Sequence, residues 1–553
     1  MVGRKGWHGS IGRISMLAGS ISAAVLVFGA TAGVSDTAQA SAVQRIGTPA
    51  SEIGRQIKPI AHAIANTATI RTIRQIREFQ AAHPSLGLHQ PMLRPLIPMG
   101  QKAYEAAKRQ AALAVGSKGP PPPQIYAAPA TQIMRAIGPA ETDSGNSFYP
   151  PDSNGAVGWN QMVAPVNLTY NVYNRVGAAQ LNTTFNALLG TSNGLSDPRV
   201  IYDPLWKRWV VTLIDVTASA SDNTCFWIAI TTGINAKGPF IVYHPCISGG
   251  AFTGGLWDYD MQGMSQDAVI ITGNLFGPAP GFGNYYGAVL VSIPKAKLYN
   301  GQPFSVPVAS TPTTVGVLTP PIIQDSNANA YFLGSDSDGT HLDLYRGSNL
   351  SNEHQFSFAL QAQISDTHAV PPAGRQPGTS QVLDTLDGRF QAPSAQYGNS
   401  LWNVHTVALG SFPSPKFYQI DTAGNSLTQA GYFYESGTSD DFNPSIAVNS
   451  NGDALVTWTA TDAVGSHPHN ARMRYSGQQS GDTLNTMPPG SLLYNSFVPL
   501  TGNFQNGRQR WGDYSSVFLD SSAPGGCTRA AIFNELIKDT NNWQVGMGIV
   551  GFC

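Results

Sequence analysis

The sequence predicts an all-β protein, a seven-bladed β-propeller preceded by a short helical N-terminal segment, with six or eight blades as the alternatives. The main observation is a degenerate motif that recurs seven times between residues 150 and 522, at a spacing of about 60 residues. Its copies begin at Pro150, Ser196, Leu256, Thr319, Asp387, Asp441 and Arg510. A repeat of this length indicates a fold of neighbouring units, because one such unit cannot bury its hydrophobic faces alone.

Each copy has the pattern of two strands joined by a turn. Most copies open near Asp, Arg or Pro, continue into a short apolar strand, turn on a polar or Gly-containing step and enter a second strand. About four short strands fit into a repeat of this length, which is the content of one propeller blade. The 58 glycines and 39 prolines suit a chain of many strands and turns rather than one of long helices.

The segment before the repeats has helical periodicity. Isoleucine recurs at steps of four, three and four from Ile53 to Ile64, and a second apolar stripe continues toward residue 80. Pro59 interrupts the first stripe, so residues 51–80 are expected to form two short helices rather than one. An alanine-rich patch over 101–115 predicts another helix, and a linker rich in Gly and Pro follows it.

The first 40 residues have the pattern of an export signal. A basic start precedes an apolar stretch over 14–34, and the small-x-small sequence Ala38-Gln39-Ala40 follows. The alternative is an uncleaved membrane anchor, which is less favoured because Ser and Gly dilute the apolar run. We therefore expect a secreted, extracellular or periplasmic protein without stable membrane insertion after signal cleavage. The expected organisation is a signal peptide over 1–40, a basic helical prosegment or leader with a Pro-rich linker over 41–140, and the propeller over 141–553.

The four cysteines all follow the expected signal peptide, as in a disulfide-bonded exported protein. Three pairings are possible in principle, and we expect the local one, Cys225 with Cys246 and Cys527 with Cys553. Each pair could then join neighbouring strands of one blade. The chain has no CxxC motif and no histidines clustered near cysteine, so a zinc site is not expected.

Charge divides the chain into a basic leader and an acidic body. Residues 41–118 carry eleven Lys or Arg and three Glu, whereas residues 119–553 carry eighteen basic and twenty-nine acidic residues. This balance is not that of a nucleic-acid-binding protein. The leader has three interpretations: an exposed segment without a partner, a prosegment that docks on the acidic body by charge complementarity, or a helix on an anionic cell surface.

Several segments resemble a known group of proteins. PPDSNG, DPRVIYD, NPSIAVNSNGD and RWGDYS occur in the same order in a group of exported bacterial β-propeller proteins described as sialidase-like or as hypothetical secreted proteins. The resemblance covers residues 147–553. It implies the fold and the export, but the group has no generally assigned reaction, and the pattern of true sialidases is only partly present.

Candidate site residues follow from propeller geometry, because the innermost strands of all blades converge on a central channel. Acid–base glycoside chemistry needs paired carboxyl groups, and arginines could hold an anionic group of a substrate. The candidates for catalysis are Asp152, Asp258, Asp441, Asp513 and His405, and those for ligand binding are Arg389 and Arg510. Further acidic residues of the expected ring are Asp197, Asp260 and Asp387.

Each of these residues also has a structural interpretation. Asp before Pro or Gly commonly caps a turn, a buried histidine commonly bonds a carbonyl, and Trp257 and Trp511 suit packing between blades better than sugar stacking. No cofactor is required by these motifs, although carboxylates without a nucleophilic role could hold Ca²⁺.

Two functions remain open. The first is an enzyme, a glycoside hydrolase or polysaccharide lyase, that acts on an extracellular polysaccharide or other glycan at the axial carboxylate and arginine site. The second is a non-catalytic propeller that binds a cell-surface or matrix partner. The expected partners are extracellular glycans rather than nucleic acid, and the protein is expected to be a monomer. The scarcity of Glu in the body favours the second, and long insertions such as 361–377 favour a shaped pocket and hence the first.

Overall fold

The computed structural model describes residues 47–87, 97–119, 129–141, 149–217, 222–278, 283–336, 338–502, 504–505 and 508–553. The expected signal peptide over 1–40 and the proline run over 120–123 lie outside these residues. All the described residues belong to one compact unit.

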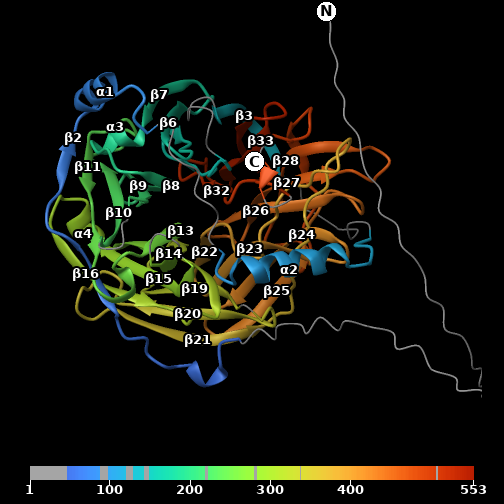
Figure 1. The fold of residues 1–553 in the computed structure, drawn as a ribbon, viewed down its shortest axis with the longest axis horizontal. Coiled ribbons are helices and arrows are strands. Elements are labelled where there is room, and N and C mark those ends of the chain that lie inside the picture. The colour runs from blue at the N-terminus through green and yellow to red at the C-terminus, as the bar shows by residue number, and fades with distance from the viewer. Residues whose placement is uncertain are drawn as a thin grey trace, which may run out of the picture. The chain divides into compact units, whose positions relative to one another are not determined.

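The prediction of an all-β propeller is confirmed by the pairing of the strands. Antiparallel pairing divides most strands in the described part of the chain into seven successive groups of four, three of which short linking strands join into one larger sheet. Figure 1 shows the strands arranged around a common centre. The first group is β4 (Ala156–Val157), β5 (Gln161–Val163), β6 (Thr169–Asn174) and β7 (Ala179–Thr184), and the second is β8 (Leu195–Asp203), β9 (Arg208–Asp215), β10 (Thr224–Thr231) and β11 (Phe240–Tyr243). The third group is β13 (Leu256–Met264), β14 (Ala268–Gly277), β15 (Asn284–Pro294) and β16 (Phe304–Ser310). The fourth group is β17 (Val315–Thr319), β19 (Asn329–Asp336), β20 (His341–Ser348) and β21 (Ser357–Ser365).

The last three groups complete the ring. The fifth group is β22 (Ser394–Tyr397), β23 (Ser400–Leu409), β24 (Phe412–Asp421) and β25 (Ser426–Tyr432). The sixth group is β26 (Asp440–Val448), β27 (Ala454–Asp462), β28 (His469–Gln478) and β29 (Ser491–Asn495). The seventh group is β32 (Ser516–Leu519), β33 (Thr528–Ile537), β34 (Trp543–Phe552) and β3 (Thr131–Ala140). Short strands β12 (Cys246–Ile247) and β18 (Pro321–Ile323) connect neighbouring groups, and β30 (Phe504–Gln505) pairs with β31 (Arg508–Gln509).

The ring closes between its last and first groups. The outermost strand of the last group, β3, comes from the N-terminal side of the first and pairs with β34. Asp152 forms a bridge with Tyr514, and the Ser516 hydroxyl donates to the Gly155 carbonyl at 2.7 Å. Because the last group takes one strand from the N-terminal end of the propeller sequence and three from the C-terminal end, both ends are needed for closure.

The expected helices over 51–80 are only partly present. Strands β1 (Ala61–Ala65) and β2 (Thr69–Arg71) replace the first of them and pair with the edge strands β16 and β11. Pro59 disfavours a helix there, and the free edges of two propeller sheets offer hydrogen bonds that the local sequence does not reveal. Helix α1 (Ile73–Ala82) follows, with a capping box between Thr72 and Gln75.

The helix expected over 101–115 is present as α2 (Gln101–Ala112). Only Tyr104, Lys108 and Ala111 of this helix are buried. Short helices α3 (Phe185–Leu189) and α4 (Lys295–Leu298) connect strands, and single 3-10 turns occupy Ala50–Glu52 and Gly250–Phe252. No helix in the described ranges is long and apolar enough to cross a membrane.

Both expected disulfides are present, Cys225–Cys246 and Cys527–Cys553. The first joins β10 to β12, in which the two cysteines are paired opposite each other. The second joins the region before β33 to the end of the chain. Both bridges thus stabilise connections within or beside one strand group, as the local pairing predicted.

Large side chains fill the spaces between neighbouring groups. Trp257 of the third group packs edge-on against Phe226 of the second, with 4.9 Å between ring centres. Trp511 packs against Phe442 at 5.9 Å in the same manner. Both tryptophans are buried, so they serve packing between blades, as expected.

Candidate functional site

The inner strands share an irregularity at the point where they approach the axis. Strands β8, β13, β17 and β26 each carry a register shift near their start. Asp197, Tyr259 and Asn443 at three of these shifts have positive φ values of 52°, 56° and 54°, and Leu386 before β22 has 56°. Such conformations are unfavourable for residues other than glycine and accumulate at functional sites. Bulges also re-aim side chains, here toward the channel.

A charged cluster lies where these strands begin, at one mouth of the channel. We call it the axial cluster; it comprises Asp152, Asp197, Arg199, Asp258, Asp260, Asp387, Arg389, Arg510 and Asp513. Arg389 binds Asp387 through two nitrogens at 2.7 and 2.9 Å, and Arg510 binds Asp513 at 2.7 Å. Both arginines predicted for ligand binding are thus engaged by aspartates of the protein itself. Carboxylate partners raise the pKa of both arginines further above their usual value.

Arg199 is a member of the cluster that the sequence analysis did not single out. Its Nε donates to the Asp260 carbonyl at 2.7 Å, and its guanidinium lies over the Tyr514 ring. Burial raises the pKa of Asp260 to about 8, although Arg199 opposes this shift. The DPRVIYD and RWGDYS segments that contain Arg199 and Tyr514 could have indicated both residues, had their aromatic and basic members been weighed beside the aspartates.

Three carboxyl groups of the cluster have no basic partner within ion-pair distance among the described residues: Asp152, Asp197 and Asp258. Burial, together with repulsion from neighbouring aspartates, raises the pKa of Asp152 and Asp258 well above the usual range. Burial also raises the pKa of Asp197, which accepts hydrogen bonds from Ser196 at 2.6 Å and from Tyr514. The mouth therefore has an excess of acidic groups, and protons or a cation are needed to balance it.

Accessibility distinguishes three members of the cluster. Asp258, Asp387 and Asp513 are partly exposed, whereas Asp152 and Asp197 are 4% and 8% exposed. The charge of Asp513 contributes to the raised pKa of Asp258, so the two groups are electrostatically coupled. Asp513 is ion-paired with Arg510, and Asp258 has no ion pair within the described part of the chain. The partly exposed carboxyl groups are thus Asp258, whose pKa is raised, and Asp387 and Asp513, each bound to an arginine.

Asp441 and His405, two residues predicted for catalysis, lie outside the axial cluster. The Asp441 carboxylate accepts from Lys118 at 2.7 Å, from Ser439 at 2.6 Å and from the Trp458 indole at 2.8 Å. His405 is fully buried, bonds the Gly388 carbonyl and the Tyr418 hydroxyl, and stacks on Phe390. Burial lowers the pKa of His405 to about 3, so its ring is neutral at ordinary pH. His405 thus bonds a carbonyl, as in its structural interpretation, whereas Asp441 is held in a buried ion pair rather than in a turn cap.

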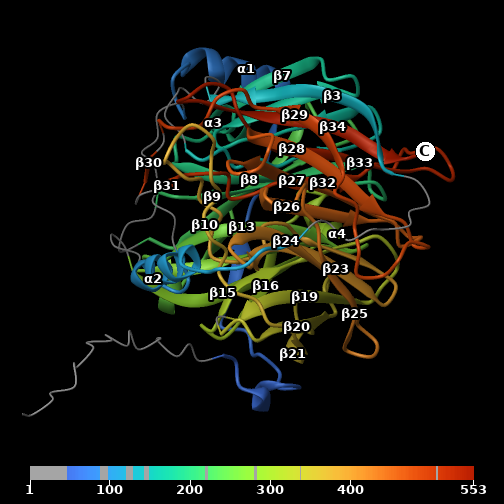
Figure 2. The same ribbon diagram turned by 90° about the vertical axis from the view of Figure 1, so that its right-hand side faces the viewer.

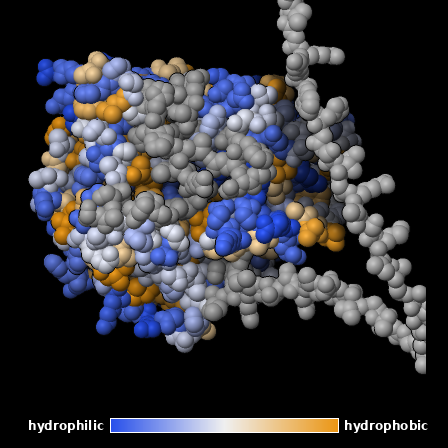
Figure 3. Space-filling model, in the orientation of Figure 1, coloured by the Kyte–Doolittle hydropathy of each residue, from blue (hydrophilic) through white to orange (hydrophobic). Residues whose placement is uncertain are grey.

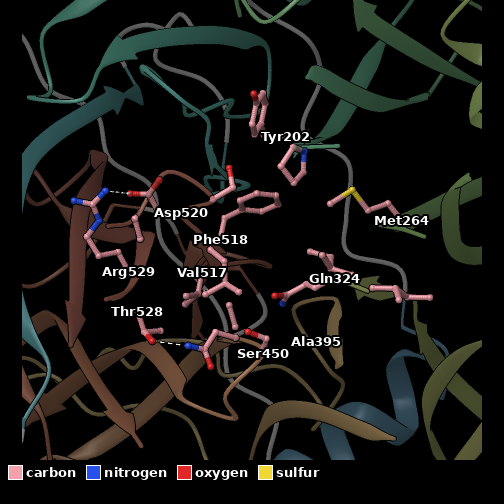
Figure 4. A pocket seen from close by; sticks show the side chains of 18 of the residues that line it. Tyr202, Met264, Gln324, Ala395, Ser450, Val517, Phe518, Asp520, Thr528 and Arg529 are labelled. Carbon is pink, nitrogen blue, oxygen red and sulfur yellow. Dashed lines mark hydrogen bonds and ion pairs between the residues drawn. The ribbon is translucent and has the colours of Figure 1, made fainter. Parts of the chain in front are cut away.

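An apolar cluster adjoins the charged one, and a cavity lies at the opposite ends of the inner strands. Tyr259, Met261, Val317, Leu386 and Tyr514, from four different strand groups, form a buried apolar cluster. Beyond it, a cavity of about 510 Å³ is lined by the far ends of the inner strands. Figure 4 shows Tyr202, Met264, Val517 and Phe518 around this cavity and the ion pair of Asp520 with Arg529 at its side.

The lining of this cavity lacks an acid pair like that of the axial cluster. Among the described residues that line it, the charged side chains are tied in pairs, Lys295 with Asp203 at 2.6 Å and Arg529 with Asp520 at 2.8 Å. The rest of the lining is apolar or carries neutral amides and hydroxyls. Acid–base chemistry is therefore better served by the axial cluster.

Helix α2 lies on the side of the axial cluster. Figure 2 shows α2 and β31 on the same face of the propeller, and Figure 3 shows the hydrophilic outer side of the helix there. The Tyr104 hydroxyl donates to Asp384, and Arg508 binds Glu105 at 2.8 and 3.1 Å. Asp384 and Tyr104 both contribute to the electrostatic environment of Arg510, which connects the helix contacts to the cluster.

Comparisons with known proteins add little to this description. No protein family model and no curated protein match the sequence. A variant of the Synechocystis apocarotenoid oxygenase is similar over 62% of this chain and 74% of its own, with 10% identity and a TM-score of 0.34. Trypanosoma rangeli sialidase is similar over 65% of this chain and 55% of its own, with 10% identity and a TM-score of 0.32. A variant of that sialidase with trans-sialidase activity covers 70% and 57%, with the same identity and score. Likeness at this level has no bearing on the reaction, and the fold rests on the strand pairing alone.

Proposed function

We propose that the protein binds an extracellular glycan at the axial cluster and cleaves it by acid–base chemistry. The observation that carries the proposal is the accessible pair Asp258 and Asp513, two coupled carboxyl groups in different electrostatic environments. Glycoside cleavage uses such a pair, in which a protonated acid donates to the leaving oxygen and a second carboxylate acts as base or nucleophile. Asp258, with its raised pKa, is suited to the acid role. Asp513, ion-paired with Arg510, is suited to the other.

The charge of the mouth narrows the kind of glycan. Arg389 and Arg510 are bound to Asp387 and Asp513, so neither provides a free site for an anionic sugar. Asp152, Asp197 and Asp258 leave the mouth acidic. A neutral or amine-bearing glycan suits this environment better than a sulfated or uronic one. The same three carboxyl groups supply the oxygen ligands that Ca²⁺ takes, so assays belong in both Ca²⁺ and EGTA.

The test is a polysaccharide screen with the mature protein and matched variants. Reducing ends report hydrolysis, and ultraviolet absorbance of unsaturated sugars reports elimination. General acid and base groups commonly contribute 10²- to 10⁴-fold, so Asp258→Asn and Asp513→Asn should each lower the rate by at least about 100-fold. Asp222→Asn, at an exposed position in the connection between β9 and β10, is the control and should leave the rate unchanged.

Two results would contradict the proposal. A rate that survives both Asp258→Asn and Asp513→Asn would place the chemistry elsewhere. Binding of a glycan without cleavage, unaffected by either variant, would support the non-catalytic propeller instead.

A further inference from the structure

A lysine of the N-terminal segment is buried at the mouth of the channel. Lys108 of α2 is 4% exposed, and its ammonium group donates to the Thr385 hydroxyl at 2.6 Å and to the Pro371 carbonyl at 3.0 Å. Asp384 lies 3.8 Å from the same nitrogen. The propeller thus contains a small pocket of three oxygen acceptors that surrounds an ammonium group, the arrangement such a group requires when it is buried.

The pocket is continuous with the axial cluster. The Asp384 backbone amide donates to the Gln509 carbonyl at 2.8 Å, next to Arg510 in the chain. The charge of Asp387, a member of the cluster, also acts on Lys108. A ligand that extends from the accessible carboxyl groups across this mouth would therefore meet the pocket next.

The helix that fills the pocket buries one side against the propeller, where Tyr104, Glu105 and Lys108 make its polar contacts. Tyr104, Lys108 and Ala111 are its buried residues, and the N-cap residue Gly100 makes no side-chain hydrogen bond to the first turn. Leu113 and Val115, directly after the helix, are 75% and 92% exposed. Segments with so little buried surface open at a smaller free-energy cost than the strands beneath them. We therefore expect the helix to detach at a smaller cost than the strands unfold.

We propose that Asp384, Thr385 and the Pro371 carbonyl form an ammonium subsite of the axial mouth, that Lys108 occupies it within the chain, and that a glycan with free amino groups displaces α2 to bind there. The inference rests on the proposed glycan function and names its substrate class, a polymer of amino sugars without N-acetyl groups. An N-acetylated sugar would bring a bulkier amide with a single N–H donor to a pocket whose oxygens accept from an amine. The helix is then a competing internal ligand that limits access to the carboxyl pair.

The test compares amine-bearing and N-acetylated ligands on the full chain. Lys108→Met keeps most of the packing of the lysine stem and removes the ammonium group. Binding of a β-1,4-linked glucosamine oligomer, measured by calorimetry, should become at least about tenfold tighter in Lys108→Met than in the wild type. The fully N-acetylated oligomer should show no such gain. Lys102→Met changes an exposed cation of the same helix and should have no effect.

A second readout follows the helix itself. Trypsin cleaves after lysine and arginine, and the exposed Arg109 of α2 becomes a substrate when the helix detaches. The glucosamine oligomer should accelerate cleavage there several-fold in the wild type, and the N-acetylated oligomer should not. Equal affinities of wild type and Lys108→Met, an equal gain for the N-acetylated oligomer, or unchanged trypsin cleavage would each overturn the inference.

These outcomes are separable from those for the proposed function. If Asp258→Asn abolishes cleavage of a glycan but the amine has no influence on binding, the acid pair stands and the ammonium subsite is wrong. If the amine-bearing oligomer displaces α2 but no glycan is cleaved, the subsite stands and the acid–base proposal is wrong.

Discussion

The buried ion pair between Lys118 and Asp441 provides a sharp test of whether the basic N-terminal segment is an integral part of the fold. Both side chains are 0% exposed and their charged atoms lie 2.7 Å apart. The Lys118 nitrogen also lies 4.5 Å from the centre of the Tyr434 ring. Lys118→Met removes the cation and leaves a buried carboxylate, a change that typically costs about 3–5 kcal/mol. Ser439, Trp458 and the Glu435 amide still donate to Asp441, so we expect the lower value, about 3 kcal/mol.

The expected shift in melting temperature follows from the size of the unit. Unfolding entropy is about 2 cal/mol/K per residue, so a cooperative unit of roughly 500 residues shifts by about 1 °C per kcal/mol. Lys118→Met should thus lower the midpoint by about 3 °C, and the double variant with Asp441→Asn by less than the sum of the single ones. Circular dichroism and tryptophan fluorescence measure both midpoints, with the exposed Lys102→Met as control. Single variants that shift the midpoint by less than 1 °C and combine additively would refute the reasoning.

Three further predictions concern closure, pH and the paired arginines. Truncation before Arg510 removes β32 to β34 and leaves β3 without a partner, so the product should be insoluble; a soluble fragment with native-like circular dichroism would count against ring closure. Burial lowers the pKa of Lys108 to about 8, and the charge of Arg508 acts in the same direction, whereas Asp384, Asp387 and Glu105 oppose the shift. Above about pH 8 the lysine of the detached helix therefore holds more protons than the docked lysine. Docking of α2 should therefore tighten as pH rises from about 8 toward 10, above which ionisation of Tyr104 in the detached helix opposes it; trypsin protection that falls over this range would contradict the sign. Arg510→Ala should destabilise the protein by about 3 kcal/mol in urea denaturation, because Asp513 loses its cation; an unchanged midpoint together with lost ligand binding would instead assign the arginine to the ligand.

The repeats allowed the fold to be predicted because each motif copy coincides with one strand group. Strand and turn patterns are local, and each group needs only its own sequence to form its hairpins. The disulfides were predictable for the same reason, since Cys225 and Cys246 lie on strands that pair directly. In contrast, β1 and β2 were expected to be helical, because their hydrogen-bond partners are strand edges more than 150 residues away, which no local pattern reports.

The sequence predicted that the aspartates of the axial cluster gather at one end of the propeller, but not which charged residues form ion pairs with one another. The aspartates before the inner strands do gather at one mouth, as the geometry of a propeller requires. Asp441 departs from this pattern because Lys118, from a segment outside the repeats, binds it inside the structure. The engagement of Arg389 by Asp387 and the contacts of Asp384 with α2 also depend on loop conformations that the sequence does not specify.

The most direct test of the account is the cleavage of a glucosamine oligomer by Lys108→Met, with and without Asp258→Asn. If the axial carboxyl pair is catalytic and α2 covers it, Lys108→Met should release reducing ends faster than the wild type. Adding Asp258→Asn should then lower the rate by at least about 100-fold without changing oligomer affinity by more than a few-fold. A double variant that cleaves as fast as Lys108→Met, or a Lys108→Met protein no faster than the wild type, would contradict the account.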